Sequence, residues 1–350
     1  MQKISASVFS SFFQSKRELN NVDMLIKYFF FLKGKDRIKM NKSKKENYKL
    51  TASYHTLEIK SDDVCLNETE TDYVKSKIAK DGSYTVSIVN PNKYDGDIFG
   101  FEQFKTVFRE ILEEAQIDLY RITRADMRFD NYDKEHYRAY SKLNKYLISA
   151  LMVTYEVKNR YKTVDLVTED QLSIAIKNDY FEIENYDRER KSEITSNSSE
   201  PAKARLEERT KAKTWRKLNN NQIYYADNKH NMELLKREFT EGWDERWNKA
   251  KKNLKLVQDV YNSALVKKYY EGLNVRPVQF RTITDFLIQH QQSIFTSMQM
   301  VNLLKRLGVT NAENRAKYHK KKYGIEYFSR KDVDYAIEEI KRATRHFFES

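Results

Sequence analysis

The stretch that decides the fold is Thr123-Arg124-Ala125-Asp126-Met127-Arg128-Phe129-Asp130. Side chains alternate across a β-strand, so the three apolar residues are predicted to share the core face and the charged residues the other. Asp126 and Asp130 on one strand face could hold a hard divalent cation, which prefers oxygen ligands. The simpler interpretation is an exposed strand face whose alternating charges are satisfied by water and by neighbouring side chains.

Further strands and helices are predicted on both sides of this stretch. Residues 50–60 and 84–89 alternate as strands do, and Asn90-Pro91-Asn92-Lys93 ends the second of them. Apolar spacing predicts helices from Phe101 and over about 133–152, followed by two or three strands in 153–186 and another at 202–210. Beyond about residue 215 the strand signals vanish and long helical patterns continue to Ser350.

We therefore expect an α+β fold in which an antiparallel-sheet domain precedes an all-α domain. The expected domain boundaries are a loosely attached basic arm at 1–47, an α+β domain at 48–220 and a helical domain at 221–350. A further hypothesis for the arm is that the natural start is Met40, with the residues before it a translated leader.

Composition and charge restrict the class of protein. The 350 residues contain 64 Lys and Arg against 51 Asp and Glu, a formal net charge of +13, which favours a polyanionic partner. Cys65 is the one cysteine, which excludes an internal disulfide framework and a zinc site built from cysteines. The longest apolar run is too short to span a membrane. We expect a cytoplasmic protein that does not enter the membrane.

Two more segments offer side chains for chemistry. In Tyr180–Tyr186, alternation puts Glu182, Glu184 and Tyr186 on one face, and Arg205-Leu206-Glu207-Glu208-Arg209 supplies another carboxylate on a predicted strand. Arg188, Arg190 and Lys191 follow and could grip phosphates. A tyrosine hydroxyl attacks a phosphodiester only when a metal lowers the barrier. For any single tyrosine among the 24, packing is the simpler interpretation.

Motifs that the chain lacks also narrow its function. The six histidines are isolated in sequence, so no His-x-His pair offers a ready metal site. The chain has neither a GxxxxGK[ST] phosphate-binding loop nor a Gly-x-Ser-x-Gly elbow, which argues against ATP-driven motors and serine hydrolases.

Taken in order over about residues 48–215, these segments resemble the Rep_trans family, the rolling-circle replication initiators of Gram-positive plasmids. The segments that carry the resemblance are Asn90-Pro-Asn-Lys93, Thr123-Arg-x-Asp126-Met-x-Phe-Asp130, Ile176–Tyr186 with the Lys/Arg/Glu-rich stretch that follows it, and Arg205-Leu-Glu207. The chain departs from the family at Glu184, where relatives typically have Arg, at Asn185-Tyr186-Asp187-Arg188, and at Arg209, which replaces a Glu. These departures leave Tyr180 as a second candidate nucleophile.

The resemblance implies a nickase/relaxase-like N-terminal domain that acts as a site-specific DNA nicking-closing enzyme. Tyr186 would attack the scissile phosphate of single-stranded or hairpin origin DNA, forming a 5′-phosphotyrosyl bond and a free 3′-OH. Asp126 and Glu207, with Asp130 as a third candidate, would hold Mg²⁺ or Mn²⁺. Arg124 is a further candidate DNA contact. The resemblance also implies a homodimer and a host helicase as partner.

The C-terminal region contains the outline of a helix-turn-helix. Val301–Leu307 ends at Gly308, a residue suited to a helix C-cap, and a basic segment begins at Asn311. Candidate contacts to phosphates and bases in this segment are Asn311, Asn314, Arg315, Lys317, Lys320, Lys321 and Lys322. The simpler interpretation is a solvated basic helix in a bundle. Ser329 and Asp332 are predicted to cap a last helix at 330–347.

Three alternatives to the initiator remain open. A conjugative relaxase would use the same chemistry at a transfer origin. A non-catalytic DNA-binding regulator would form no covalent adduct and need no metal. An RNA-binding module could stack bases on the aromatic strands, although the chain has no RNP-like signature.

Overall fold

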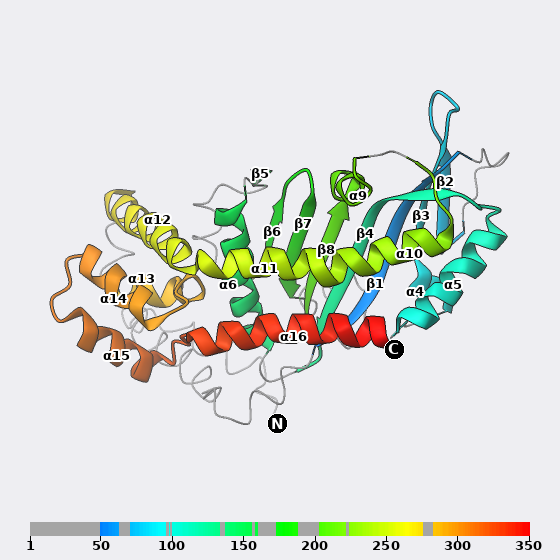
Figure 1. Cartoon of the computed structure of the whole chain (residues 1–350). Helices are drawn as coiled ribbons and strands as arrows, with labels where there is room; N and C mark the ends of the chain where they lie inside the picture. Colours follow the sequence, from blue (N-terminus) through cyan, green and yellow to red (C-terminus); the bar gives the residue numbers. More distant parts are fainter. Residues whose placement is uncertain are drawn as a thin grey trace, which may run out of the picture.

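The computed structural model describes residues 50–62, 71–95, 98, 100–133, 137–155, 158–159, 173–187, 203–221, 224–275 and 283–350. These residues form an α+β fold, an antiparallel sheet with helices followed by a helical C-terminal region (Figure 1), which confirms the predicted class. The predicted arm at 1–47 and Cys65 lie outside the described residues.

The strands are β1 (Leu50–Ser61), β2 (Val74–Ile78), β3 (Thr85–Val89), β4 (Tyr120–Asn131), β5 (Lys158–Asn159), β6 (Ile174–Lys177), β7 (Phe181–Asp187) and β8 (Ala204–Lys211). The helices are α4 (Pro91–Asp95), α5 (Phe101–Glu114), α6 (Tyr137–Thr154), α9 (Ala212–Leu218), α10 (Asn228–Arg237), α11 (Trp243–Lys252), α12 (Leu254–Val275), α13 (Ile283–Gln289), α14 (Ser297–Arg306), α15 (Ala312–Tyr323) and α16 (Arg330–Glu349). A π-helical turn, η1 (Glu238–Gly242), joins α10 to α11, and a 3-10 turn, η2 (Gln291–Ser293), follows α13.

The sheet has the strand order β2-β3-β1-β4-β8-β7-β6-β5, which puts β4 between β1 and β8. Because residues directly opposite one another in a sheet point to the same face, the pairs Asp126↔Arg209 and Arg128↔Glu207 put these four charged residues of β4 and β8 on one face. The alternation predicted from the sequence for β4 is confirmed.

Two β-bulges interrupt the pairing of β1 with β4. The first leaves His55 as an extra residue between Tyr54, opposite Met127, and Thr56, opposite Asp126. The second, next to Glu58, leaves Thr123 as an extra residue of β4. A bulge kinks the strand and redirects a side chain, and bulges occur often beside functional sites.

The helices cover the apolar face of the sheet. Helix α6 packs on β6, β7 and β8, whereas α16 packs on β1 and α10 on β4. The ring of Tyr54 in β1 lies 5.4 Å from that of Phe239 and 5.3 Å from that of Phe347, so aromatic contacts tie the sheet to η1 and α16. The helices after residue 220 therefore share one core with the sheet.

A buried ion cluster fixes η1 and α11 to β8. Arg246 Nη2 forms an ion pair with Glu208 Oε1 at 2.8 Å and donates to Glu238 Oε1 at 2.6 Å, and both carboxylates are almost fully buried. Burial, only partly offset by Arg246, raises the pKa of Glu208 to about 7. Gly242 leaves room for the cluster, because a Cβ there would lie 2.7 Å from Glu238 Oε2. Only a glycine fits beside this carboxylate without a shift.

The helical pattern predicted beyond about residue 215 includes the run α10–η1–α11, which buries Phe239, Trp243 and Trp247. Helices α12 to α15 gather at one end of the molecule, and α16 runs back across the sheet (Figure 1). Helix α16 begins at the predicted capping box of Ser329 and Asp332. Among the described helices, none is both long and apolar enough to cross a bilayer.

His290, between α13 and η2, is a buried histidine whose two ring nitrogens have no hydrogen-bond partner among the described residues. Burial, and then repulsion by Lys268 and Lys145, lowers the pKa of His290 from 6.5 to about 4. Below pH 6.5 the unfolded chain therefore binds a proton at this residue that the folded chain does not, so acid favours unfolding.

We expect this histidine to remove up to about 3 kcal/mol of unfolding free energy as the pH falls from 6.5 to 4. His290→Gln should flatten that part of the pH profile, as measured by urea unfolding at a series of pH values. His346→Gln, at an exposed position of α16, is the matched control. Equal pH slopes for the wild type and His290→Gln would contradict the assignment.

Candidate functional site

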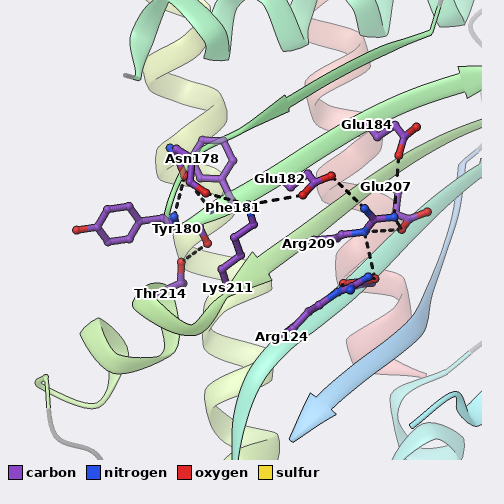
Figure 2. A network of polar contacts seen from close by, with 11 residues as sticks. Arg124, Asn178, Tyr180, Phe181, Glu182, Glu184, Glu207, Arg209, Lys211 and Thr214 are labelled. Carbon is purple, nitrogen blue, oxygen red and sulfur yellow. Dashed lines mark hydrogen bonds and ion pairs between the residues drawn. The ribbon is translucent and has the colours of Figure 1, made fainter. Parts of the chain in front are cut away.

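The polar face of the sheet brings together side chains from four adjacent strands, β1, β4, β8 and β7, and Figure 2 shows side chains of β4, β8 and β7. Asp126 of β4, Glu207 of β8 and His55 of β1 each offer a ligand atom, and these atoms lie within 4.8 Å of one another. Asp126 and Glu207 are buried and His55 is partly buried. These three residues form a metal-capable group, since an imidazole and two carboxylates are ordinary ligands of divalent cations.

Arg209 occupies the centre of the surrounding carboxylates. Its guanidinium lies 2.8 Å from Glu207 Oε1, 3.3 Å from Asp126 Oδ2 and 3.1 Å from Glu182 Oε1, with Glu184 at 4.0 Å. Figure 2 shows this residue connecting three strands. A guanidinium is a permanent cation, so Arg209 offsets the repulsion among the acidic groups.

The two carboxylates of the group have opposite pKa shifts. Burial raises the pKa of Asp126, although the ion pairs with Arg124 and Arg209 offset part of this effect. Burial acts in the same direction on Glu207, but Arg209, His55 and the hydrogen bond from Tyr186 outweigh it and lower the pKa. Glu207 is therefore ionised at neutral pH and able to accept a proton or bind a cation.

The hydroxyl of Tyr186 lies beside the metal-capable group. It donates to Glu207 Oε2 at 3.1 Å, and the side chain is 5% exposed. Pairing of Tyr186 with Arg205 puts the tyrosine on the polar face, as the alternation predicts. The structure thus brings Tyr186, Asp126 and Glu207 together from three strands that are far apart in sequence.

Asp130, the third acidic candidate, lies outside the metal-capable group. Its two carboxylate oxygens accept from Arg205 Nε at 2.6 Å and Nη2 at 2.9 Å, and Arg128 lies 3.4 Å away. Burial would lower the pKa of Arg205, but Asp130, together with Tyr186, raises it. Asp130 therefore holds a buried cation next to the tyrosine.

The remaining sheet candidates lie in three places. Arg124 forms a bidentate pair with Asp126, its Nε lying 2.7 Å from Oδ1. Tyr180 is 46% exposed at the β6–β7 turn, and it lies four positions along β7 from Glu184, or about 13 Å. Arg188, Arg190 and Lys191 fall outside the described residues.

The candidates in the C-terminal helices are exposed on α15. Leu307–Asn311 form the turn between α14 and α15, with Gly308 in the left-handed region at φ 76°. Ala312, Ala316 and His319 face the protein. The outer side carries the predicted candidates Asn311, Asn314, Arg315, Lys317, Lys320, Lys321 and Lys322.

The sequence did not predict His55 as a ligand, because no second histidine lies close to it in the sequence. The signal for His55 is instead a change in which positions of β1 are buried. The apolar buried residues of β1 are at even positions up to Tyr54 and at odd positions from Leu57. This change of phase is the sequence signal of the bulge that carries His55. His55 Nδ1 lies 2.8 Å from Thr56 Oγ1, and an N–H bond there would leave the lone pair on Nε2 for a metal.

The chain was compared with models of known protein families, with curated proteins and with solved structures, and none of the three comparisons finds a match.

Because Arg209 and a metal ion would compete for the same carboxylate oxygens, Arg209→Gln should raise the affinity for Mn²⁺ about tenfold. Asp126→Asn removes a ligand charge and should lower it by at least about tenfold. Isothermal titration with MnCl₂ measures both effects.

Arg109→Gln, at an exposed position of α5, is the control and should bind Mn²⁺ as the wild type does. Unchanged binding in both Arg209→Gln and Asp126→Asn would show that Mn²⁺ does not bind at this group.

Proposed function

We propose that this protein is a plasmid rolling-circle replication initiator, which nicks origin DNA by attack of Tyr186 on a phosphodiester. One observation carries the proposal: the Tyr186 hydroxyl donates to Glu207, and Glu207 belongs to the metal-capable group with His55 and Asp126. A phenol beside a potential cation site is what a metal-assisted tyrosine transesterification requires. The resemblance of residues 48–215 to the Rep_trans family supports the same reaction.

The residues around the hydroxyl suit the proton transfer. Glu207 Oε2 already accepts from the Tyr186 hydroxyl, and this carboxylate takes the phenol proton as the tyrosine oxygen bonds to phosphorus. The bond from phosphorus to O3′ breaks, and O3′ takes a proton from water. The products are a 5′-phosphotyrosyl bond and a free 3′-OH. Arg205, close to Tyr186, is a cation that can stabilise the phenolate as it forms.

The donor set also bears on the metal. His55, Asp126 and Glu207 would hold a divalent cation, which would neutralise charge on the phosphoryl oxygens. Mg²⁺ is bound almost entirely by oxygen, whereas transition-metal ions accept an imidazole readily. His55 therefore favours Mn²⁺ over Mg²⁺.

In this proposal, helices α14 and α15 recognise duplex DNA. The exposed side of α15 carries Arg315, Lys317 and Lys321 with Asn314 in the first helical turn. Cations of this kind contact phosphates, and an asparagine at the start of a recognition helix can read an adenine edge. A homodimer and a host helicase remain expectations from the resemblance alone.

Two of the three alternatives use residues that the initiator also uses. A conjugative relaxase would use the same residues, and the genes beside the coding sequence separate it from an initiator. A non-catalytic regulator would use only the basic helix. A covalent adduct distinguishes both enzymes from the regulator.

The tyrosine is tested with 3′-labelled single-stranded oligonucleotides that cover the candidate origin, incubated with the protein and Mn²⁺. We expect a labelled adduct that survives SDS, because the 5′-phosphate of the labelled fragment is bonded to the protein. Tyr186→Phe lacks the attacking oxygen and should abolish the adduct, as should EDTA.

Tyr180→Phe is the matched control, because this tyrosine lies on the same hairpin but away from Glu207. It should retain the adduct. An adduct that persists in Tyr186→Phe and disappears in Tyr180→Phe would assign the nucleophile to Tyr180, and no adduct in the wild type would favour the regulator.

The basic helix is tested by the salt dependence of duplex binding. Replacing Arg315, Lys317 and Lys321 together by Gln should weaken binding and lower the slope of log K against log salt by about 3, roughly one unit per lost phosphate contact. Fluorescence anisotropy with a labelled origin duplex at several salt concentrations measures the slope.

The control replaces three cations on other helices, Lys105 and Arg109 of α5 and Lys267 of α12, by Gln. An equal loss of slope in the control would indicate general charge attraction rather than a contact made by α15.

A further inference from the structure

A cavity of about 190 Å³ lies where β1, β4 and α9 meet, separate from the metal-capable group. Three cations line it from three different elements: Lys60 of β1, Arg121 of β4 and Arg216 of α9. Trp215 and Tyr224 add aromatic rings to the wall. The cavity therefore combines positive charge with aromatic surface.

The cavity keeps its positive charge because little acidic charge faces it. Among the described residues, Glu58 is the one carboxylate in the lining, and its Oε1 already accepts from Thr123 Oγ1 at 2.7 Å. Lys60 Nζ lies 4.0 Å from the centre of the Tyr84 ring, and the Arg121 guanidinium lies 5.5 Å from that of Tyr225. A cation over an aromatic ring is attracted by the face of the ring, so its N–H groups stay available to other acceptors.

Two residues of the lining carry a buried donor that has no acceptor among the described residues. Trp215 is 3% exposed, and its Nε1 has no hydrogen-bond partner among the described residues. Arg121 Nε is buried and likewise unpartnered within the part of the chain that the structure describes. A buried donor without an acceptor destabilises the folded protein, and a bound acceptor would remove that cost. Donors and positive charge together select an anion rich in acceptor oxygens.

We infer that this cavity binds a phosphate group of a nucleotide, with Arg121, Lys60 and Trp215 Nε1 as donors and Tyr224 beside the base or sugar. The phosphate comes either from a DNA strand or from a free nucleotide, and the chemistry is the same. Thr123 lines the cavity and lies three residues from Asp126, or about 10 Å along β4. A strand source rests on the proposed function, because the strand that reaches Tyr186 would then pass this cavity.

The test measures binding of thymidine 5′-monophosphate, thymidine and the single strand dT8 to the full chain by isothermal titration. The wild type should bind the monophosphate and dT8, and thymidine at least about tenfold more weakly, because the phosphate supplies the acceptors. Arg121→Gln should lose at least about tenfold in affinity for the monophosphate. Trp215→Phe keeps an aromatic ring but removes the Nε1 donor, so it should lose severalfold.

Arg109→Gln on α5 is again the control and should bind as the wild type does. Weaker binding of dT8 by Arg121→Gln supports a strand as the source, and weakening of the monophosphate alone supports a free nucleotide. Absence of binding by the wild type, equal binding of thymidine and its monophosphate, or unchanged affinity in Arg121→Gln would each overturn the inference.

The experiments test phosphate binding in the cavity and the nickase chemistry independently of each other. Monophosphate binding that depends on Arg121, with no adduct from the wild type, leaves the phosphate cavity standing and removes the proposed function. An adduct that requires Tyr186, with Arg121→Gln binding the monophosphate as the wild type does, leaves the nickase standing and removes the cavity.

Discussion

Asp126 and Glu207 are two buried carboxylates on neighbouring antiparallel strands, and they repel each other unless a cation lies between them. Arg209 is that cation in this structure, and Arg124 adds a second on the side of Asp126. The geometry of the polar face depends on this balance, since an unpaired carboxylate at such burial would take up a proton instead. The same balance keeps Glu207 ionised and able to accept from Tyr186.

The alternation of β4 was enough to predict which side chains share the polar face, because the rule needs only the strand itself. Partners across strands could not be predicted in the same way. Arg205 was one cation among many in the sequence, and only the pairing Asp130↔Arg205 shows which carboxylate it neutralises. From the sequence alone, Asp130 could equally be a metal ligand or the partner of an arginine, because both arrangements satisfy a buried carboxylate.

The irregular pairing of β1 with β4 explains why His55 was not predicted. A uniform strand was assumed for residues 50–60, and in a uniform strand His55 has no special position. The apolar residues change phase between Tyr54 and Leu57, and again between Ile122 and Ala125 in β4, at the two bulges. The sequence predicted the change from strands to helices at about residue 215, and in the structure β8 ends at Lys211. It did not predict the core that sheet and helices share, because that core depends on contacts such as that of Tyr54 with Phe347.

The bulge at His55 has a consequence for how such a group can be gained or lost. Tyr54 and Thr56 lie opposite consecutive residues of β4, Met127 and Asp126, so the two strands would stay in register if His55 were simply absent. Removal of one codon would delete the imidazole and leave the rest of the ladder in place. The one nitrogen donor of the metal-capable group is thus supplied by an inserted residue, and a chain without that residue would keep only the two carboxylates, Asp126 and Glu207.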